Sequence, residues 1–168
     1  MDRFVDAVSK SLKEKNWLSA LSLSLLLPDI CGRLEKSNAK STERYIEWFD
    51  WWVGPRYTHE IGPSHQRHVF LSGADCYSLR CALSHEGRDN IEDQRARKAL
   101  KDFMIVEPPP VGAGMIHCNQ IDDTLQLQVD IFCTDIIAGV RNWMASVEGK
   151  AAINAGQQSS LISIKSIR

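Results

Sequence analysis

The sequence predicts a mainly α-helical fold: a helical bundle with a small antiparallel β-sheet inserted before the last long helix. Apolar residues recur at three- and four-residue spacing on both sides of an insertion at about 102–129, and within the insertion they alternate as in strands. A chain of 168 residues with 43% hydrophobic content suits one domain over residues 1–149. Residues 150–168 are expected to form a C-terminal tail or an edge strand.

Three helices are expected in the first third of the chain, at residues 2–15, 16–35 and 41–53. Asn16 is a candidate N-cap for the second helix, whose apolar residues almost surround it, so this helix should be central. Pro28 should interrupt or kink it. The third helix is dense in aromatic residues, so packing should dominate it.

The rest of the chain is organised around residues 71–87, where a helix is bounded by signals at both ends. Ser72 followed by Asp75 is a capping-box-like start, and Gly87 can take the left-handed conformation that ends a helix. Arg80 is the one charged residue in the apolar middle of this helix. We therefore expect its guanidinium in or at the edge of the core, where it needs an anionic partner.

Asp50, between two aromatic residues of the third helix, is the first candidate partner for Arg80, and Glu47 is the second. His85 lies in the last turn of the Arg80 helix. On a regular helix the two side chains diverge by about 140°, so one helix cannot easily aim both at one small substrate. A shared site then requires an unwound last turn or two copies of the helix that meet in a dimer.

Residues 79–87, with the sequence LRCALSHEG, resemble the signature of HEPN domains, in which Arg and His are separated by four residues. HEPN domains are helical bundles of prokaryotic toxins, antiphage proteins and CRISPR-associated ribonucleases. The segment is also similar to that of small bacterial proteins without an assigned function. The HEPN resemblance implies a homodimeric, metal-independent endoribonuclease or a nucleotide-binding protein. In that chemistry a 2′-OH attacks the adjacent phosphate, His85 is the general base or acid, and Arg80 stabilises the phosphorane.

Residues 54–68 contain two Gly-Pro dipeptides and are predicted to form a loop. Tyr57, His65 and His68 are its candidate binding groups for a phosphate or a base. A zinc site built on the loop histidines is a further hypothesis, but no matching Cys or carboxylate motif accompanies them. We therefore assign no metal and no cofactor, and a solvated loop is the simplest interpretation.

Residues 88–101 begin acidic and end basic, which complements a helix dipole and predicts a helix. Arg95 and Arg97 belong to the densest basic cluster of the chain, which Lys98 and Lys101 complete. If RNA binds, we expect its phosphates along this segment.

Three short strands are expected at residues 103–106, 115–118 and 125–129, in one antiparallel sheet. The strongest helical periodicity in the chain then predicts a helix over residues 128–147, ended by Gly149.

The formal net charge of −1 gives no global sign of nucleic-acid binding, so any such activity has to be local. The N-terminus lacks the pattern of a signal peptide, and the most apolar stretch, residues 18–27, is shorter than the ~20 residues that span a bilayer. We expect a cytoplasmic protein without membrane contact. Its five cysteines suit a reducing compartment, where they act as small core residues.

The alternative to a ribonuclease is a noncatalytic interaction or ligand-binding module in which Arg80 forms a buried structural ion pair. Cys81 favours this alternative, because catalytic HEPN proteins usually carry Asn, Asp or His directly after the Arg. The two hypotheses differ in the surroundings that they require. A catalytic site needs His85 accessible in a cleft near Arg80 or near its symmetry mate.

Overall fold

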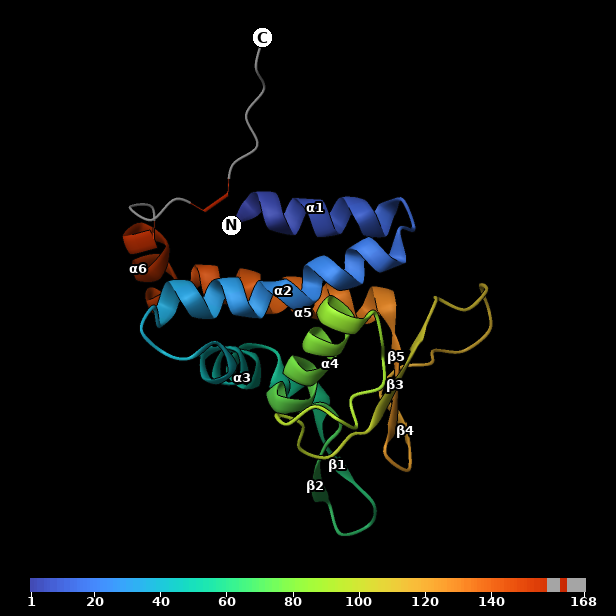
Figure 1. Cartoon of the computed structure of the whole chain (residues 1–168). Coiled ribbons are helices and arrows are strands. Elements are labelled where there is room, and N and C mark those ends of the chain that lie inside the picture. The colour runs from blue at the N-terminus through green and yellow to red at the C-terminus, as the bar shows by residue number, and fades with distance from the viewer. Residues whose placement is uncertain (157–160, 163–168) are drawn as a thin grey trace.

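The structure, a computed structural model, describes residues 1–156, 161 and 162 and confirms a mainly helical fold with a small β component (Figure 1). The helices are α1 (Asp2–Lys13), α2 (Trp17–Glu35), α3 (Ser41–Trp52), the 3-10 helix η1 (Gly54–Tyr57), α4 (Gly73–Glu86), α5 (Val129–Ala145) and α6 (Val147–Gly156). The strands are β1 (Thr58–Ile61), β2 (Gln66–Val69), β3 (Asp102–Val106), β4 (Asn119–Ile121) and β5 (Thr124–Gln128).

Helix α2 is the central element of the bundle and packs against all the other α-helices. In Figure 1, α1 covers one side of α2 while α3 and α4 lie on the opposite side. The predicted cap is present, because the Asn16 side chain accepts a hydrogen bond from the Ser19 N–H at 3.2 Å. Pro28 does not end the helix, which runs continuously to Glu35. The helix therefore spans the predicted range as one continuous element, and by length and composition alone it could cross a membrane, a test that a central core helix also passes.

Glycines allow α2, α3 and α4 to approach one another closely. A Cβ atom on Gly32 of α2 would lie 2.7 Å from the carbonyl oxygen of Arg44 on α3. A Cβ atom on Gly73, the first residue of α4, would lie 2.6 Å from the carbonyl oxygen of Ile46 on α3. Both helix contacts are thus made backbone to backbone, and larger side chains would separate the helices.

Both predicted ends of α4 are confirmed. The Ser72 hydroxyl accepts a hydrogen bond from the Asp75 N–H at 3.1 Å, and Gly87 ends the helix in the left-handed conformation with φ 67°. Helix α5 also occupies most of its predicted range. The main core lies between α2, α3, α5 and the inner face of the larger sheet, and its largest fully buried aromatic side chains are Tyr45, Phe49, Tyr57, Phe103, Phe132 and Trp143.

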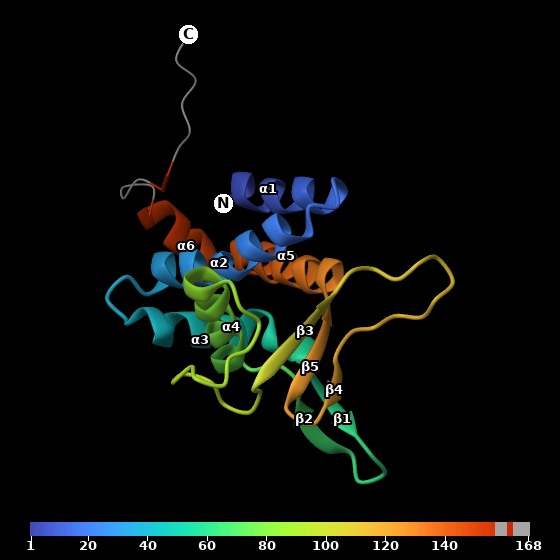
Figure 2. The ribbon, with the colours of Figure 1, turned by 45° about the vertical axis from the view of Figure 1, so that its right-hand side comes forward.

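The sheet structure differs from the predicted single antiparallel sheet. The larger sheet has the order β3-β5-β4, in which β3 and β5 are parallel and β4 and β5 are antiparallel. The parallel pair β3 and β5 requires a crossover, which consists of the long connection between β3 and β4 together with β4 itself; the connection projects away from the bundle (Figure 2). The segment 54–68, predicted as a loop, instead contains η1, β1 and the start of β2, and β1 and β2 pair as an antiparallel hairpin.

Two further predictions were wrong. Residues 88–101 form an irregular loop, not a helix. The last long helix ends at Ala145, and α6 follows it directly, so residues 150–156 are helical where a tail or an edge strand was predicted. Helix α6 packs on α2 and α5, which extends the domain beyond residue 149. Residues 157–160 and 163–168 of the predicted tail lie outside the described residues.

Candidate functional site

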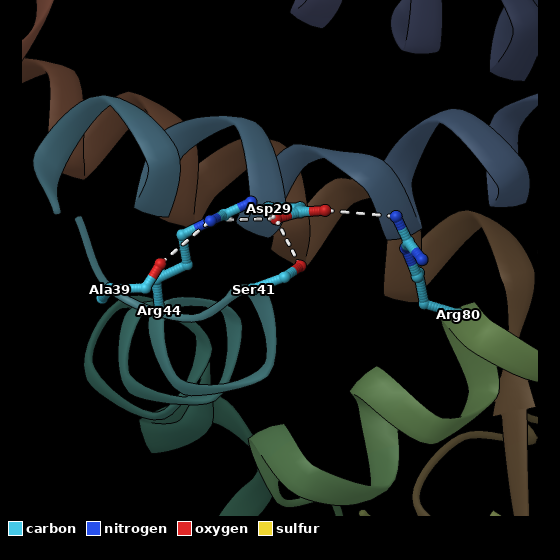
Figure 3. A network of polar contacts seen from close by, with 5 residues as sticks. All are labelled: Asp29, Ala39, Ser41, Arg44 and Arg80. Atoms are coloured by element: carbon cyan, nitrogen blue, oxygen red, sulfur yellow. Dashed lines mark hydrogen bonds and ion pairs between the residues drawn. The ribbon is translucent and has the colours of Figure 1, made fainter. Parts of the chain in front are cut away.

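Asp29, on α2, joins three helices through its carboxylate (Figure 3). Its Oδ1 accepts hydrogen bonds from Nε and Nη2 of Arg44 at 3.1 and 2.9 Å, and from the Ser41 hydroxyl at 3.2 Å. Its Oδ2 accepts one from Nη2 of Arg80 at 3.1 Å. Arg44 and Ser41 belong to α3 and Arg80 to α4, so one carboxylate holds both neighbouring helices against α2.

The Asp29 network is largely shielded from water. The side chains of Asp29 and Arg44 are each 16% exposed, and that of Arg80 is 19% exposed. At this depth, removal of one partner leaves a poorly solvated charge, which typically costs about 3–5 kcal/mol. Nε of Arg80 is itself buried and has no hydrogen-bond partner among the described residues. The guanidinium of Arg80 therefore faces the protein interior and is paired there with Asp29.

The predicted partner of Arg80 was wrong, because Asp29 takes the place assigned to Asp50. Oδ1 of Asp50 instead accepts a hydrogen bond from the backbone N–H of Gly73 at 2.6 Å and so caps the N-terminus of α4. Burial raises the pKa of Asp50 above its ordinary value, and this hydrogen bond partly opposes the increase. Glu47, the second candidate, forms an ion pair with Lys36 at the surface.

His85 is exposed in the last turn of α4. Within the part of the chain that the structure describes, its side chain takes part in no hydrogen bond or ion pair, and it lines neither the cavity between α2, α3 and α6 nor the cavity near the N-terminus of α4. Arg80 points toward α2 on the inner side of the same helix. One copy of the chain therefore does not bring the two proposed catalytic side chains together.

Asp75 anchors the loop 88–101 to α4, a role that the sequence did not reveal. Its Oδ1 accepts hydrogen bonds from three consecutive backbone N–H groups, those of residues 98, 99 and 100, at 2.7, 3.0 and 3.3 Å. Its Oδ2 accepts one from the Ser72 hydroxyl at 2.6 Å. The residue is only 2% exposed. The carboxylate thus takes the backbone donors that a helix would have used, and the basic segment is fixed as a loop.

Arg95 and Arg97 lie in this anchored loop but differ in their surroundings. Arg95 is exposed, whereas Arg97 is partly buried and its Nε donates a hydrogen bond to the carbonyl oxygen of Glu92 at 2.8 Å. Lys101 is paired with Asp123 at 3.2 Å. The basic cluster of the sequence is therefore only partly free to meet a phosphate.

Tyr57 does not offer its ring to a ligand, contrary to the prediction, because it is fully buried. Its hydroxyl donates a hydrogen bond to Oδ2 of Asp135 on α5 at 3.2 Å. The same oxygen lies 3.9 Å from Nε2 of His117, and Arg56 approaches the other oxygen at 3.8 Å. Nδ1 of His117 accepts a hydrogen bond from the Gln128 N–H at 3.3 Å. Both ring nitrogens face protein groups, so this cluster fastens η1 and the loop before β4 to α5.

The pKa values in this cluster follow from its burial. Burial lowers the pKa of His117, and the nearby Asp135 and Asp130 carboxylates only partly oppose this decrease. Burial raises the pKa of Asp135, against the effects of the Tyr57 hydroxyl, Arg56 and His117. His117 is therefore favoured in its neutral form, in which Nδ1 can accept the backbone hydrogen bond.

His65 and His68 lie on the β1–β2 hairpin without forming a joint site. His65 is exposed and its Nδ1 lies 3.1 Å from Oε2 of Glu60. His68 contacts the Gln120 side chain at 3.0 Å through Nε2 and stacks edge-on against Phe70. No cluster of three or more His, Cys, Asp or Glu side chains suited to a metal ion occurs among the described residues.

The cysteines are free thiols. Burial raises the pKa of Cys76 to about 12 and that of Cys118 and Cys133 to about 11. A thiol with such a pKa stays protonated at neutral pH and is a poor nucleophile. His117 and Cys118, neighbours in the sequence, therefore do not form a nucleophilic pair, because Nδ1 of His117 is hydrogen-bonded to the backbone and Cys118 stays a thiol.

A cavity of about 590 Å³ opens between the C-terminal half of α2, α3 and the start of α6. Such a volume lies in the range of small-molecule sites. Its lining residues are Gly32, Glu35, Lys36, Arg44, Glu47, Trp48, Asp50, Trp51, Trp52 and Glu148. A second cavity of about 480 Å³ lies near the N-terminus of α4 and includes Arg67 and Lys98 in its lining.

Comparison of the chain with protein-family models, with curated proteins and with solved structures gives no match.

Sequence reasoning missed Asp29, Asp75 and Asp135 as the organising carboxylates. Asp29 is the only acid between Trp17 and Leu34, just as Arg80 is the only Arg or Lys of α4. A lone acid and a lone cation on two apolar helices are a signal for pairing, because each needs a counter-charge when it is buried. Asp135 carried no such signal, because α5 also contains Asp130 and Arg141.

Proposed function

We propose that the chain is a noncatalytic binding module in which Arg80 is a structural tie. The observation that carries this proposal is the Arg80–Asp29 ion pair at 3.1 Å, made inside a shielded network with Arg44. A guanidinium held in this way cannot leave its carboxylate to stabilise charge on a substrate without a large energetic cost. The exposed His85, on the other side of the same helix, has no acid or base partner among the described residues.

The cavity between α2, α3 and α6 supports a binding role. Its lining combines three tryptophan rings with six charged side chains that can orient a ligand. It lies beside the Asp29 network, since Arg44 belongs to both. The network therefore holds α3 in the position that forms one wall of the cavity.

The test compares Arg80→Met with His85→Ala. We expect Arg80→Met to lower the free energy of unfolding by about 2–4 kcal/mol, because Asp29 loses one of its two cations. His85→Ala should change stability by less than about 0.5 kcal/mol, since the side chain is exposed. Neither purified variant nor the wild type should cleave RNA in the presence of a metal chelator.

A second candidate function is the metal-independent RNA cleavage that the HEPN resemblance implies. The observation in its favour is that His85 is exposed at the end of α4, where a second copy of the chain could approach it. In that case a homodimer would bring the His85 of each copy to the RNA. Cleavage by the wild type that falls at least about 100-fold in His85→Ala, with unfolding unchanged, would establish this function and overturn the first proposal.

A further inference from the structure

We infer that the cavity between α2, α3 and α6 binds an alkylammonium cation. This inference rests on the proposed binding function and names the ligand class for that function. The ligand would place its charged group against indole rings, with carboxylates nearby.

Three tryptophans in the last turns of α3, Trp48, Trp51 and Trp52, supply the aromatic part of the lining. Trp48 is buried, Trp52 is partly buried, and Trp51 is 74% exposed, which is unusual for so large an apolar ring. Indole rings have the most favourable face for a cation among the aromatic side chains. Among the described residues the one such contact is Arg3 over Phe4, so no protein cation occupies the faces of these tryptophans.

The charged part of the lining is acidic. Four carboxylates and two cations line the cavity, which leaves a formal charge of −2; the carboxylates are Glu35, Glu47, Asp50 and Glu148. An alkylammonium ion complements this charge, whereas a phosphate or a carboxylate ligand would be repelled.

The two cations of the lining are already paired. All three nitrogens of the Arg44 guanidinium donate to protein oxygens, two of them to Asp29 and one to the carbonyl oxygen of Ala39. Lys36 forms an ion pair with Glu47. The hydrogen bond with Glu47 raises the pKa of Lys36, and the nearby Glu35 and Glu43 carboxylates add to this effect. The carboxylates around the cavity thus already stabilise one ammonium group, that of Lys36.

Glu35 and Glu148 remain without a cation within the described part of the chain. Oε2 of Glu35 accepts a hydrogen bond from the indole N–H of Trp143 at 2.8 Å, which orients the carboxylate. Glu148 lies exposed in the first turn of α6, which packs on α2, and also lines the cavity. These two carboxylates would flank the cation.

The experiment titrates the ¹⁵N-labelled full chain with choline and follows the indole N–H resonance of Trp51. The uncharged carbon isostere of choline, dimethylbutanol, is the matched control ligand. Choline should shift the resonance and saturate it, and dimethylbutanol should bind at least about 10-fold more weakly. A peptide-like probe, Nα-acetyl-trimethyllysine amide, distinguishes the two sources of the same group: tighter binding than choline assigns the cavity to a protein side chain rather than to a free metabolite.

Variants separate the aromatic and the charge contributions. Trp51→Leu should weaken choline binding about 3- to 5-fold, and the affinity of Trp51→Phe should lie between those of Trp51→Leu and the wild type. Binding to these two variants is followed through the indole N–H resonance of Trp52. The double variant Glu35→Gln and Glu148→Gln should weaken choline binding about 3- to 10-fold. Lys36→Met should strengthen choline binding about 2- to 5-fold, because it removes a competing cation. Glu14→Gln, directly after α1, is the control and should leave choline binding unchanged.

Equal affinity for choline and dimethylbutanol overturns the inference, as does weaker choline binding by Lys36→Met. Absence of any indole shift up to about 50 mM choline also overturns it, because even millimolar binding would be seen. These outcomes leave the proposed noncatalytic role intact if RNA is not cleaved. Cleavage of RNA that depends on His85 overturns that role instead.

Discussion

Replacing Asp75 by Asn should release the basic loop from the N-terminus of α4 and destabilise the protein. The side chain is 2% exposed and accepts four hydrogen bonds. Residues 98 and 99 are exposed, so their N–H groups can form hydrogen bonds with water in the variant. Their loss of the Asp75 carboxylate therefore changes the free energy of unfolding little. The buried N–H of Leu100 and the Ser72 hydroxyl each lose a hydrogen bond to a charged group, worth about 1.5–3 kcal/mol.

Because the Asn amide keeps one acceptor oxygen, we expect Asp75→Asn to cost about 2–4 kcal/mol of the free energy of unfolding, measured by urea denaturation. Amide hydrogen exchange of residues 98–100 should accelerate in the same variant. Asp122→Asn, at an exposed turn, is the matched control and should lie within about 0.5 kcal/mol of the wild type. If Asp75→Asn matches that control and exchange is unchanged, the carboxylate does not hold the loop.

Three other perturbations test the remaining structure. Gly73→Ala should cost about 1–3 kcal/mol in urea denaturation, because its Cβ would lie 2.6 Å from the Ile46 carbonyl oxygen; an unchanged midpoint would contradict the close helix contact. His117→Gln should make stability less sensitive to acid. The lowered pKa of His117 means that the unfolded chain binds its proton first, so the wild type should lose stability as pH falls below about 6.5, and equal pH profiles for both proteins would refute this. With a thiol-alkylating reagent at neutral pH, buried Cys76, whose pKa is raised to about 12, should react only on unfolding, and fast labelling of the native protein would disagree.

Local signals in the sequence were sufficient where one segment determines its own structure. The caps at Asn16, Ser72 and Gly87 were read correctly, because each acts on backbone groups within a few residues. The periodicity of α5 was equally clear, because it is a continuous apolar stripe. These signals account for the helical class and for most helix positions.

Features that depend on distant contacts were not readable in the same way. Residues 88–101 have a helical charge pattern, yet the Asp75 carboxylate takes the N–H groups of residues 98–100. The parallel pairing of β3 with β5 depends on where a long connection crosses, which strand alternation does not encode. The Gly62-Pro63 dipeptide, taken as a sign of a loop, lies in the turn between β1 and β2.

The candidate site illustrates the same limit. The sequence indicated that Arg80 needs an anion, and the structure provides one. The pairing signal of Asp29 was missed, because Pro28 suggested a break in the helix just where Asp29 faces α3 and α4. The α2–α3–α6 cavity combines residues from three separate segments and has no local motif.

A double-mutant cycle between Asp29 and Arg80 tests most directly whether this arginine is a structural tie. The free energies of unfolding of Asp29→Asn, Arg80→Met, the double variant and the wild type give the coupling energy of the pair. For an ion pair at 3.1 Å with less than a fifth of either side chain exposed, we predict a coupling of at least about 1 kcal/mol. A coupling within about 0.3 kcal/mol of zero would show that Arg80 does not depend on Asp29 and would return it to the list of candidate catalytic residues.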